Sequence, residues 1–307
     1  MKTMIQETYK DFNVFKMMDK TVFIHIKLNC DTFYEDLIAF FFKEEKLLSY
    51  IYNKTTIEFD ATIQQYVSLF KVLSGFIDTE NLDADIEKMK IELNEYIDWE
   101  KYSDDELLKL RRDKIGKIGE YILHNILSDY FNFTCILPKL VLNTNKNMSV
   151  FGIDVIFFDE KNKMLLFGES KVSKNLHNGV NLINKSLKNY EHQICEEYRT
   201  ILSSELINKN LPEEIKKYIG KAMSFKKFIE IANIKRIGIP IFIMSGEDTN
   251  LESINKKLDK IDKVDFMGLE ITYYIINLPI IDKNVFQSKV IKFLRERSDY
   301  YESKCEW

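Results

Sequence analysis

Glycine and proline are scarce in this sequence. Its 307 residues include 10 Gly and 4 Pro, and neither G-x-x-x-x-G-K-[ST] nor G-x-G-x-x-G occurs. Phosphate-binding loops of these two types need closely spaced glycines, so we expect that any step requiring ATP is carried out by another chain. The low Gly and Pro counts also mark no clear linker, and we place a domain boundary near residue 100.

Cysteine is equally sparse and has no metal-binding spacing. Cys30, Cys135, Cys195 and Cys305 are scattered without any C-x-x-C pair, which argues against a disulfide framework and against a zinc ribbon. His192 and Cys195 could supply two metal ligands, but no second pair accompanies them. We therefore expect ordinary surface or core positions for these residues.

The sequence also lacks long hydrophobic runs. The strongest apolar cluster, "LIAFFF" at 37–42, is far too short to span a bilayer, and the opening "MKTMIQETYK" lacks the apolar region of a secretory signal. With 45% hydrophobic and 30% charged residues, the chain can bury one large core or two moderate ones. We expect a folded, soluble protein of the cytoplasm.

An excess of positive charge is absent as well. The net charge is −4 and the pI is near 5.8, so the chain has no general attraction for a polyanion and would need a local basic patch or a partner to bind nucleic acid. A basic run around residues 109–117 could follow a DNA backbone or form a solvated helix face. Our predicted nucleic-acid contacts are Arg111, Arg112, Lys114, Lys117 and Lys174.

Strand-like and helical patterns alternate along the chain. In the first hundred residues, 21–28 is typical of a strand, and 31–43 and 61–75 of helices. We find no catalytic constellation there, and this α+β region could be a docking surface for a partner or a structural elaboration. "SDDE" at 103–106 is a capping box that predicts a helix to about Tyr130. The elements expected after it are strands at 133–142, 152–159 and 163–172, helices at 178–206 and up to 233, strands at 237–244 and 271–278, and a helix near 283–300.

The segment "KMLLFGESKV" at 163–172 contains the first candidate catalytic residues. Glu169 and Lys171 are two residues apart and share one face of this strand, which pairs as a hairpin with 152–159. A two-residue turn would place Asp154 opposite Phe167, and a four-residue turn would place it opposite Glu169. In either register Asp154 lies near Glu169 and Lys171. Two close carboxylates need a cation between them, and hard oxygen ligands favour Mg²⁺ or Mn²⁺.

Such a metal would support phosphoryl-transfer chemistry, because it polarises a phosphate oxygen and activates water, while a lysine neutralises developing charge. The alternative is a cross-strand salt bridge at a sheet edge. The tripeptide itself is not specific, since Glu302-Ser303-Lys304 repeats it. Only the copy at 169–171 ends an apolar strand and follows an Asp on a partner strand.

The helix "GKIGEYILHNIL" at 116–127 brings one more acid. Glu120 could swing toward the sheet, or it could be an exposed acid paired with Lys117 or Lys114. We expect His124, one turn later, on a solvated face.

This order of a helix with an acid, a strand, a strand with Asp, a strand with Glu-x-Lys and a further helix resembles the PD-(D/E)xK nucleases. The resemblance implies an α/β fold with an αβββαβ core over residues 101–307, divalent-metal dependence and phosphodiester hydrolysis. It assigns catalytic roles to Asp154, Glu169, Lys171 and Glu120, and metal contacts to Asp154, Glu169, Glu120 and the Ser170 carbonyl. Ile153 stands where the motif has Pro.

The pairing of 116–127 with 152–172 resembles more closely the HamA family, the nuclease effectors of Hachiman anti-phage defence. That resemblance covers roughly residues 60–300 and implies a partner helicase, HamB-like, that restrains the nuclease until it engages damaged or foreign DNA. Two alternatives stay open. The first is a stand-alone restriction-type endonuclease, and the second is a non-catalytic nucleic-acid or partner-binding module on a degenerate nuclease fold.

Overall fold

The structure is a computed structural model of the chain. It describes residues 3–8, 12–18, 21–28, 33–52, 63–64, 66–67, 113–137, 152–203, 213–219, 221, 223–246, 250–280 and 283–304. The capping box at 103–106, the boundary expected near residue 100, and Arg111 and Arg112 lie outside these ranges.

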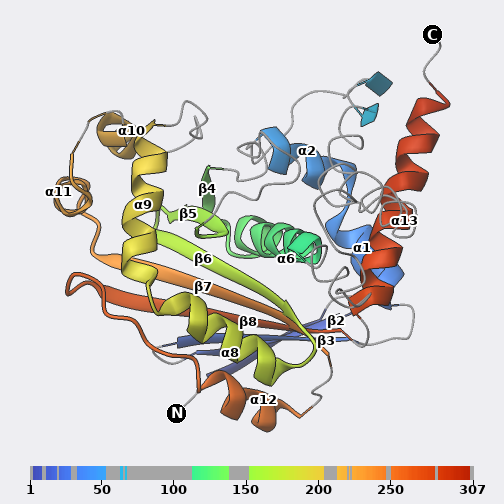
Figure 1. The fold of residues 1–307 in the computed structure, drawn as a ribbon, viewed down its shortest axis with the longest axis horizontal. Helices are drawn as coiled ribbons and strands as arrows, with labels where there is room; N and C mark the ends of the chain where they lie inside the picture. The colour runs from blue at the N-terminus through green and yellow to red at the C-terminus, as the bar shows by residue number, and fades with distance from the viewer. Residues whose placement is uncertain are drawn as a thin grey trace, which may run out of the picture.

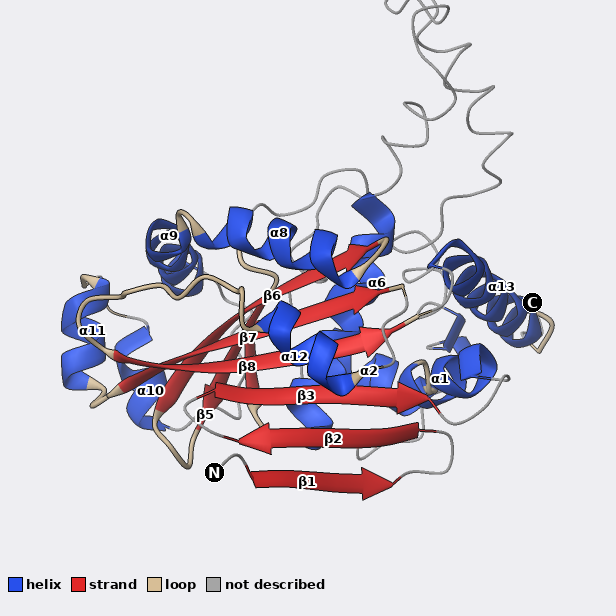
Figure 2. Cartoon of the chain, turned by 90° about the horizontal axis from the view of Figure 1, so that it is seen from below, coloured by secondary structure: helices blue, strands red, loops and turns tan. Residues whose placement is uncertain are grey.

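One mixed sheet of eight strands organises the described part of the chain (Figures 1 and 2). Its order is β1-β2-β3-β8-β7-β6-β5-β4; β3, β8, β7 and β6 run parallel, and the outer strands on both sides are antiparallel. The strands are β1 (Thr3–Thr8), β2 (Phe12–Met18), β3 (Thr21–Leu28), β4 (Thr134–Leu137), β5 (Val155–Asp159), β6 (Met164–Ser173), β7 (Arg236–Ser245) and β8 (Glu270–Pro279). The N-terminal strands thus share a sheet with the strands around Asp154 and Glu169.

Helices cover both faces of the sheet, as expected for parallel strands with continuous apolar runs. The described helices are α1 (Phe33–Phe41), α2 (Glu44–Tyr52), α6 (Asp113–Asn125), the π-helix η2 (Ile126–Tyr130), α8 (Leu176–Leu187), α9 (Tyr190–Ser203), α10 (Glu213–Ile219), α11 (Phe225–Ile231), α12 (Leu251–Leu258) and α13 (Lys283–Glu302). One apolar cluster joins α1, α2, α6 and α13 to the sheet, and a second joins α8, α9, α11 and α12 to the other face. The expected α/β class is confirmed as a mixed sheet flanked by helices.

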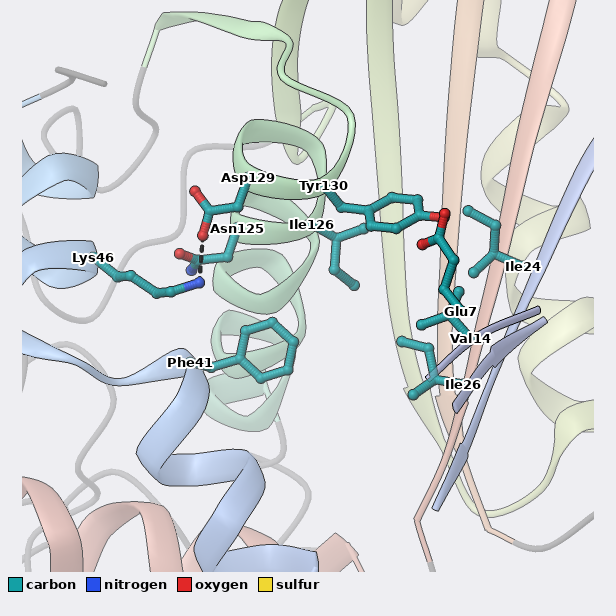
Figure 3. Close-up of a pocket in the computed structure, with 10 residues that line it drawn as sticks. All are labelled: Glu7, Val14, Ile24, Ile26, Phe41, Lys46, Asn125, Ile126, Asp129 and Tyr130. Carbon is teal, nitrogen blue, oxygen red and sulfur yellow. Dashed lines mark hydrogen bonds and ion pairs between the residues drawn. The ribbon is translucent and has the colours of Figure 1, made fainter. Parts of the chain in front are cut away.

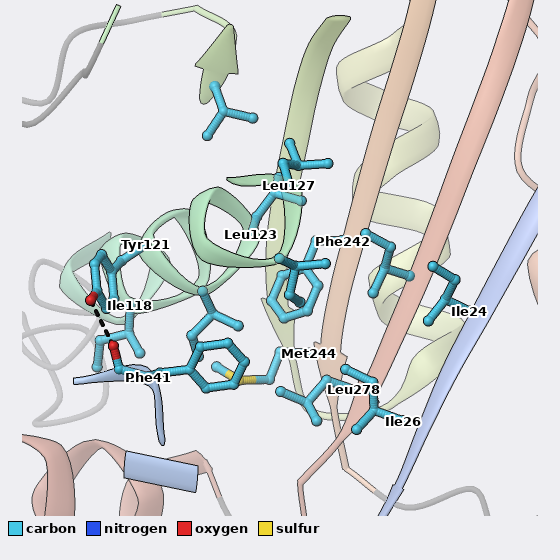
Figure 4. Packing of buried hydrophobic residues seen from close by; sticks show 14 of the residues in the cluster. Ile24, Ile26, Phe41, Ile118, Tyr121, Leu123, Leu127, Phe242, Met244 and Leu278 are labelled. Atoms are coloured by element: carbon cyan, nitrogen blue, oxygen red, sulfur yellow. Dashed lines mark hydrogen bonds between the residues drawn. The ribbon is translucent and has the colours of Figure 1, made fainter. Parts of the chain in front are cut away.

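Helix α6 is buried on more than one side (Figure 4). Ile118 and Leu123 are fully buried in the cluster that also contains Phe242 of β7, and the Tyr121 hydroxyl donates to the Phe41 carbonyl of α1 (2.7 Å). The helix therefore lies between the sheet and the N-terminal helices.

Two expected helices are each divided in two. The helix predicted at 178–206 breaks at Lys188 and Asn189 into α8 and α9, and Leu187 and Tyr190 on either side of the turn are both buried. The helix predicted up to 233 is α10 and α11, and α11 has its own N-cap, since the Ser224 side chain accepts a hydrogen bond from the Lys227 N–H. Among the described residues no helix is both long enough and apolar enough to cross a membrane.

Candidate active site at the β5–β6 hairpin

The β5–β6 hairpin closes through a four-residue turn. Asp159 pairs with Met164 and Val155 with Gly168, which is the register that the four-residue turn predicts. Asp154 directly precedes β5, and its backbone N–H donates to the carbonyl of Gly168 (3.0 Å), the residue already opposite Val155, so the pairing is irregular at this point. Of the two registers that the sequence left open, the structure has that of the four-residue turn, which brings Asp154 close to Glu169.

Asp154 is a carboxyl group held in place by the backbone of the neighbouring strand. Its Oδ2 accepts a hydrogen bond from the Ser170 N–H (2.7 Å). Burial raises the pKa of Asp154 well above its usual range, the negative charges of Glu169 and Glu120 raise it further, and Lys171 and the Ser170 N–H oppose the shift. Glu169 and Glu120 therefore lie close enough to Asp154 for their charges to affect its pKa.

Glu169 and Lys171 form an ion pair on β6. Glu169 is 4% exposed, and its Oε1 accepts from the Lys171 ammonium. Burial alone would lower the pKa of Lys171, but Glu169, Asp154 and Glu120 together outweigh burial and raise it, which keeps the lysine charged. The other oxygen, Glu169 Oε2, is buried and has no hydrogen-bond partner among the described residues. A buried anionic oxygen without a donor is costly, and a cation would satisfy it.

Glu120 reaches this region from α6 because the helix packs very close to β6. A Cβ on Gly119 would lie 2.6 Å from Ser170 Oγ and 3.0 Å from Val172 Cγ2, so only glycine allows this approach. The Lys117 ammonium donates to both oxygens of Glu120 (2.9 and 3.0 Å). Glu120 thus has the partner that the sequence suggested, and its charge still acts on Asp154 and Lys171.

Two buried residues of α9 near the site were not among the predicted site residues. Glu197 is buried, and its Oε1 accepts from the Ile153 N–H (3.1 Å), just before Asp154. Tyr190 is also buried and donates to the Phe167 carbonyl (2.7 Å). Burial and the charges of Glu169, Asp154 and Glu197 raise the pKa of Tyr190 well above its usual range, so its hydroxyl stays protonated. The available signal was spacing, since Glu197 lies three residues after buried Ile194 on the apolar stripe of α9.

Comparison with known proteins adds the family. The sequence model of the HamA family matches residues 11–294, most of the chain. The chain belongs to the HamA family. It is also 24% identical over 148 residues to MJ1060, an uncharacterized protein of Methanocaldococcus jannaschii; the match spans 47% of this chain and only 26% of that protein. No solved structure matches the chain.

The described part of this HamA-family chain has no group of three His, Cys, Asp or Glu side chains that could hold a metal ion by themselves. Asp154, just before β5, and Glu169 of β6 provide two neighbouring carboxylates, while Lys117 binds the third nearby acid, Glu120. In this arrangement Lys171 balances the charge of Glu169, and Lys117 balances that of Glu120.

The other predicted residues of this HamA-family chain fall into different environments. Lys117 is 13% exposed and bound to Glu120, whereas Lys174, directly after β6, is exposed. Lys114 lies in α6, and its side chain is outside the described set. The expectation of a solvated His124 was wrong. Its ring packs on Phe157 (5.1 Å between centroids), and burial lowers its pKa to about 3, so it is neutral.

A cavity of about 480 Å³ lies at the far end of α6 in this HamA-family chain (Figure 3). Apolar side chains of β2, β3 and α1 and of η2 form its walls, with Tyr130 and the Lys46–Asp129 ion pair among the lining residues. Its described lining includes none of Asp154, Glu169 and Lys171. It is therefore separate from the candidate active site.

Proposed function

We propose that this HamA-family chain is a metal-dependent deoxyribonuclease, the effector of a Hachiman anti-phage system under the control of a partner helicase. One observation carries the proposal. Asp154 accepts a hydrogen bond from the backbone of Ser170, which lies between Glu169 and its ion-pair partner Lys171 on β6, and the buried Oε2 of Glu169 has no hydrogen-bond partner in the described part of the chain. Supporting this, α6, β4, β5, β6, α8 and β7 follow one another in the order expected of an αβββαβ core.

The proposed cofactor is Mg²⁺ or Mn²⁺, held by Asp154 and Glu169, with the Ser170 carbonyl and Glu120 as further oxygen ligands. The raised pKa of Asp154 fits this set, because a carboxyl that resists ionisation beside two other acids becomes a good ligand once a dication offsets their repulsion. When bound, the metal would polarise the phosphate and activate water.

The protein's own residues have separate tasks in this proposal. The Ser170 N–H fixes the orientation of Asp154, and the charged Lys171 stabilises negative charge that develops on the scissile phosphate. Metal binding at Glu169 would free Lys171 from its ion pair and so make the ammonium available to the substrate.

Cleavage of plasmid and linear DNA by the purified chain, in Mg²⁺ and in EDTA, tests the activity. The key variant is Glu169→Gln, which keeps an oxygen acceptor for Lys171 but removes the charge. The chain supplies a matched control in Glu302→Gln, because Glu302-Ser303-Lys304 is the same tripeptide at the end of α13. We expect cleavage to need the metal and Glu169 and to be unchanged in Glu302→Gln. Equal cleavage of DNA by Glu169→Gln and Glu302→Gln would refute the assignment of Glu169 as a catalytic residue.

The helicase is proposed because the chain belongs to the HamA family, and residues 1–100 are the proposed docking region. Repeating the digestion with the helicase and ATP tests the control. Cleavage that is slow alone and stimulated by DNA-engaged helicase supports it. Full activity without any partner would instead favour a stand-alone restriction-type endonuclease.

A non-catalytic binding module is the second candidate, and a specific observation favours it: Lys171 and Lys117 already neutralise Glu169 and Glu120. On this reading the charges are structural. It predicts no cleavage with or without the helicase, and a loss of stability in Glu169→Gln that Mg²⁺ does not affect.

A further inference from the structure

A short basic stretch with no acidic residue runs from α10 into α11. Residues 216–227 contain five lysines and no Asp or Glu, although the whole chain carries −4. The rest of the chain therefore carries −9, so this is a local concentration of positive charge rather than a general property. We call Lys216, Lys217, Tyr218, Lys221, Lys226 and Lys227 the α10–α11 lysine surface.

Most lysines of this surface are exposed and have no acidic partner among the described residues. Lys217, Lys221, Lys226 and Lys227 are exposed, and none of them forms an ion pair with a described residue. Lys216 alone pairs, with the exposed Glu213 (2.8 Å). Exposed lysines that lie close together in the chain and have no acidic partner among the described residues are suited to contact the phosphates of a nucleic acid.

An aromatic ring lies among these lysines. Tyr218 is partly exposed, and the ammonium groups of Lys217 and Lys221 lie 5.8 and 5.7 Å from its ring centroid. A ring flanked by two cations combines a stacking surface with charge, a pairing typical of contacts to nucleic-acid strands.

Aromatic packing places the start of α11 beside the strand that carries Glu169. Phe225, the first residue of α11, contacts Phe167 of β6 (6.1 Å between centroids) and Tyr198 of α9 (4.9 Å). Phe167 shares a sheet face with Glu169 two residues later, which is about 7 Å along a strand. Figures 1 and 2 both show α9, α10 and α11 near one another, at the end of the sheet where β6 and β7 begin.

We propose that the α10–α11 lysine surface binds the phosphate backbone of the DNA that enters the site at Asp154 and Glu169. The inference rests on the proposed function and names the substrate-binding surface for it. It differs from the earlier prediction around Arg111 and Lys114, which lies on another segment.

Fluorescence anisotropy with a short labelled DNA duplex, in EDTA and in a Glu169→Gln background, measures binding without cleavage. The test variants are Lys217→Gln with Lys221→Gln, and Lys226→Gln with Lys227→Gln. The control, Lys256→Gln with Lys260→Gln, removes the same charge from exposed positions at α12. We expect each test pair to weaken binding roughly tenfold and to lower the slope of log K against log salt by about 2, and the control pair to change neither.

Unchanged affinity and slope in both test pairs, or a parent chain that binds no duplex at low salt, would overturn the inference. So would variants that bind DNA normally but no longer co-purify with the helicase, since the surface would then serve an acidic protein partner. The nuclease proposal is judged separately by Glu169-dependent cleavage: cleavage with unaffected binding in the lysine variants removes only this inference.

Discussion

At the scale of single residues, the carboxylate of Glu197 fixes the backbone in front of Asp154. It accepts from the Ile153 N–H (3.1 Å), and Gly152, at φ 121°, leaves room for it, since a Cβ there would lie 2.1 Å from Glu197 Oε1. Glu197 is therefore a positioning residue, which acts through Asp154 rather than on a substrate.

Two substitutions of Glu197 distinguish the effect of its hydrogen-bond acceptor from the effect of its charge. Glu197→Ala leaves the Ile153 N–H unsatisfied and should lower the free energy of unfolding by about 1–3 kcal/mol, while Glu197→Gln retains the acceptor. We expect faster hydrogen exchange at Ile153 and slower DNA cleavage in the Ala variant, with both largely restored in Gln. Glu196→Ala, on the exposed neighbour, is the control. Equal exchange at Ile153 in all chains would contradict the role.

The raised pKa of Asp154 predicts a pH dependence of stability. A carboxyl with a raised pKa holds its proton in the folded state where the unfolded chain has lost it, so stability falls as pH rises from the unfolded pKa, about 4, through the folded value. Asp154→Asn removes this term and keeps an oxygen for the Ser170 N–H. Urea unfolding in EDTA should show the variant gaining stability relative to wild type between acidic and neutral pH. Parallel pH profiles would refute the shift.

At the scale of elements, the contact between α6 and β6 depends on one of two glycines in the same helix. A Cβ at Gly119 would lie 2.6 Å from Ser170 Oγ, whereas a Cβ at Gly116 would meet nothing within 4 Å. Gly116→Ala should stabilise the helix by about 0.5–1 kcal/mol through its better helix propensity. Gly119→Ala should instead destabilise by about 1–3 kcal/mol, because α6 must move away from β6.

Denaturant unfolding of the two alanine variants measures this difference, and cleavage assays follow its effect on the site, because α6 carries Glu120. We expect activity to fall only in Gly119→Ala. A stabilised, fully active Gly119→Ala would show that the close approach is unnecessary.

The same elements show what the sequence could predict. The β5–β6 hairpin follows from two apolar runs separated by a short polar turn, which is local information. Its register did not follow, because turn length decides it and a shift of the turn moves Asp154 from Phe167 to Glu169. Glu197 was missed because its partner is 44 positions away in the chain. His124 was misplaced because α6 is covered by the sheet and by α1, so its polar residues do not mark a solvent face.

At the scale of the whole molecule, the N-terminal strands complete the sheet. β3 pairs in parallel with β8, whose inner residues are buried, so β1–β3 cover an edge that would otherwise be long and apolar. A chain that lacks residues 1–28 should therefore aggregate, which size-exclusion chromatography would detect. A monomeric truncated chain with native near-UV circular dichroism would show that this region is dispensable for the fold.

The proposed binding of a divalent cation by Asp154 and Glu169 can be measured without DNA or a partner that controls cleavage. Calorimetric titration of Mn²⁺ into wild type, Glu169→Gln and Glu302→Gln tests it most directly. We predict one saturable binding event in wild type and Glu302→Gln that is lost in Glu169→Gln. Equal binding in all three chains, or none in wild type, would contradict the account.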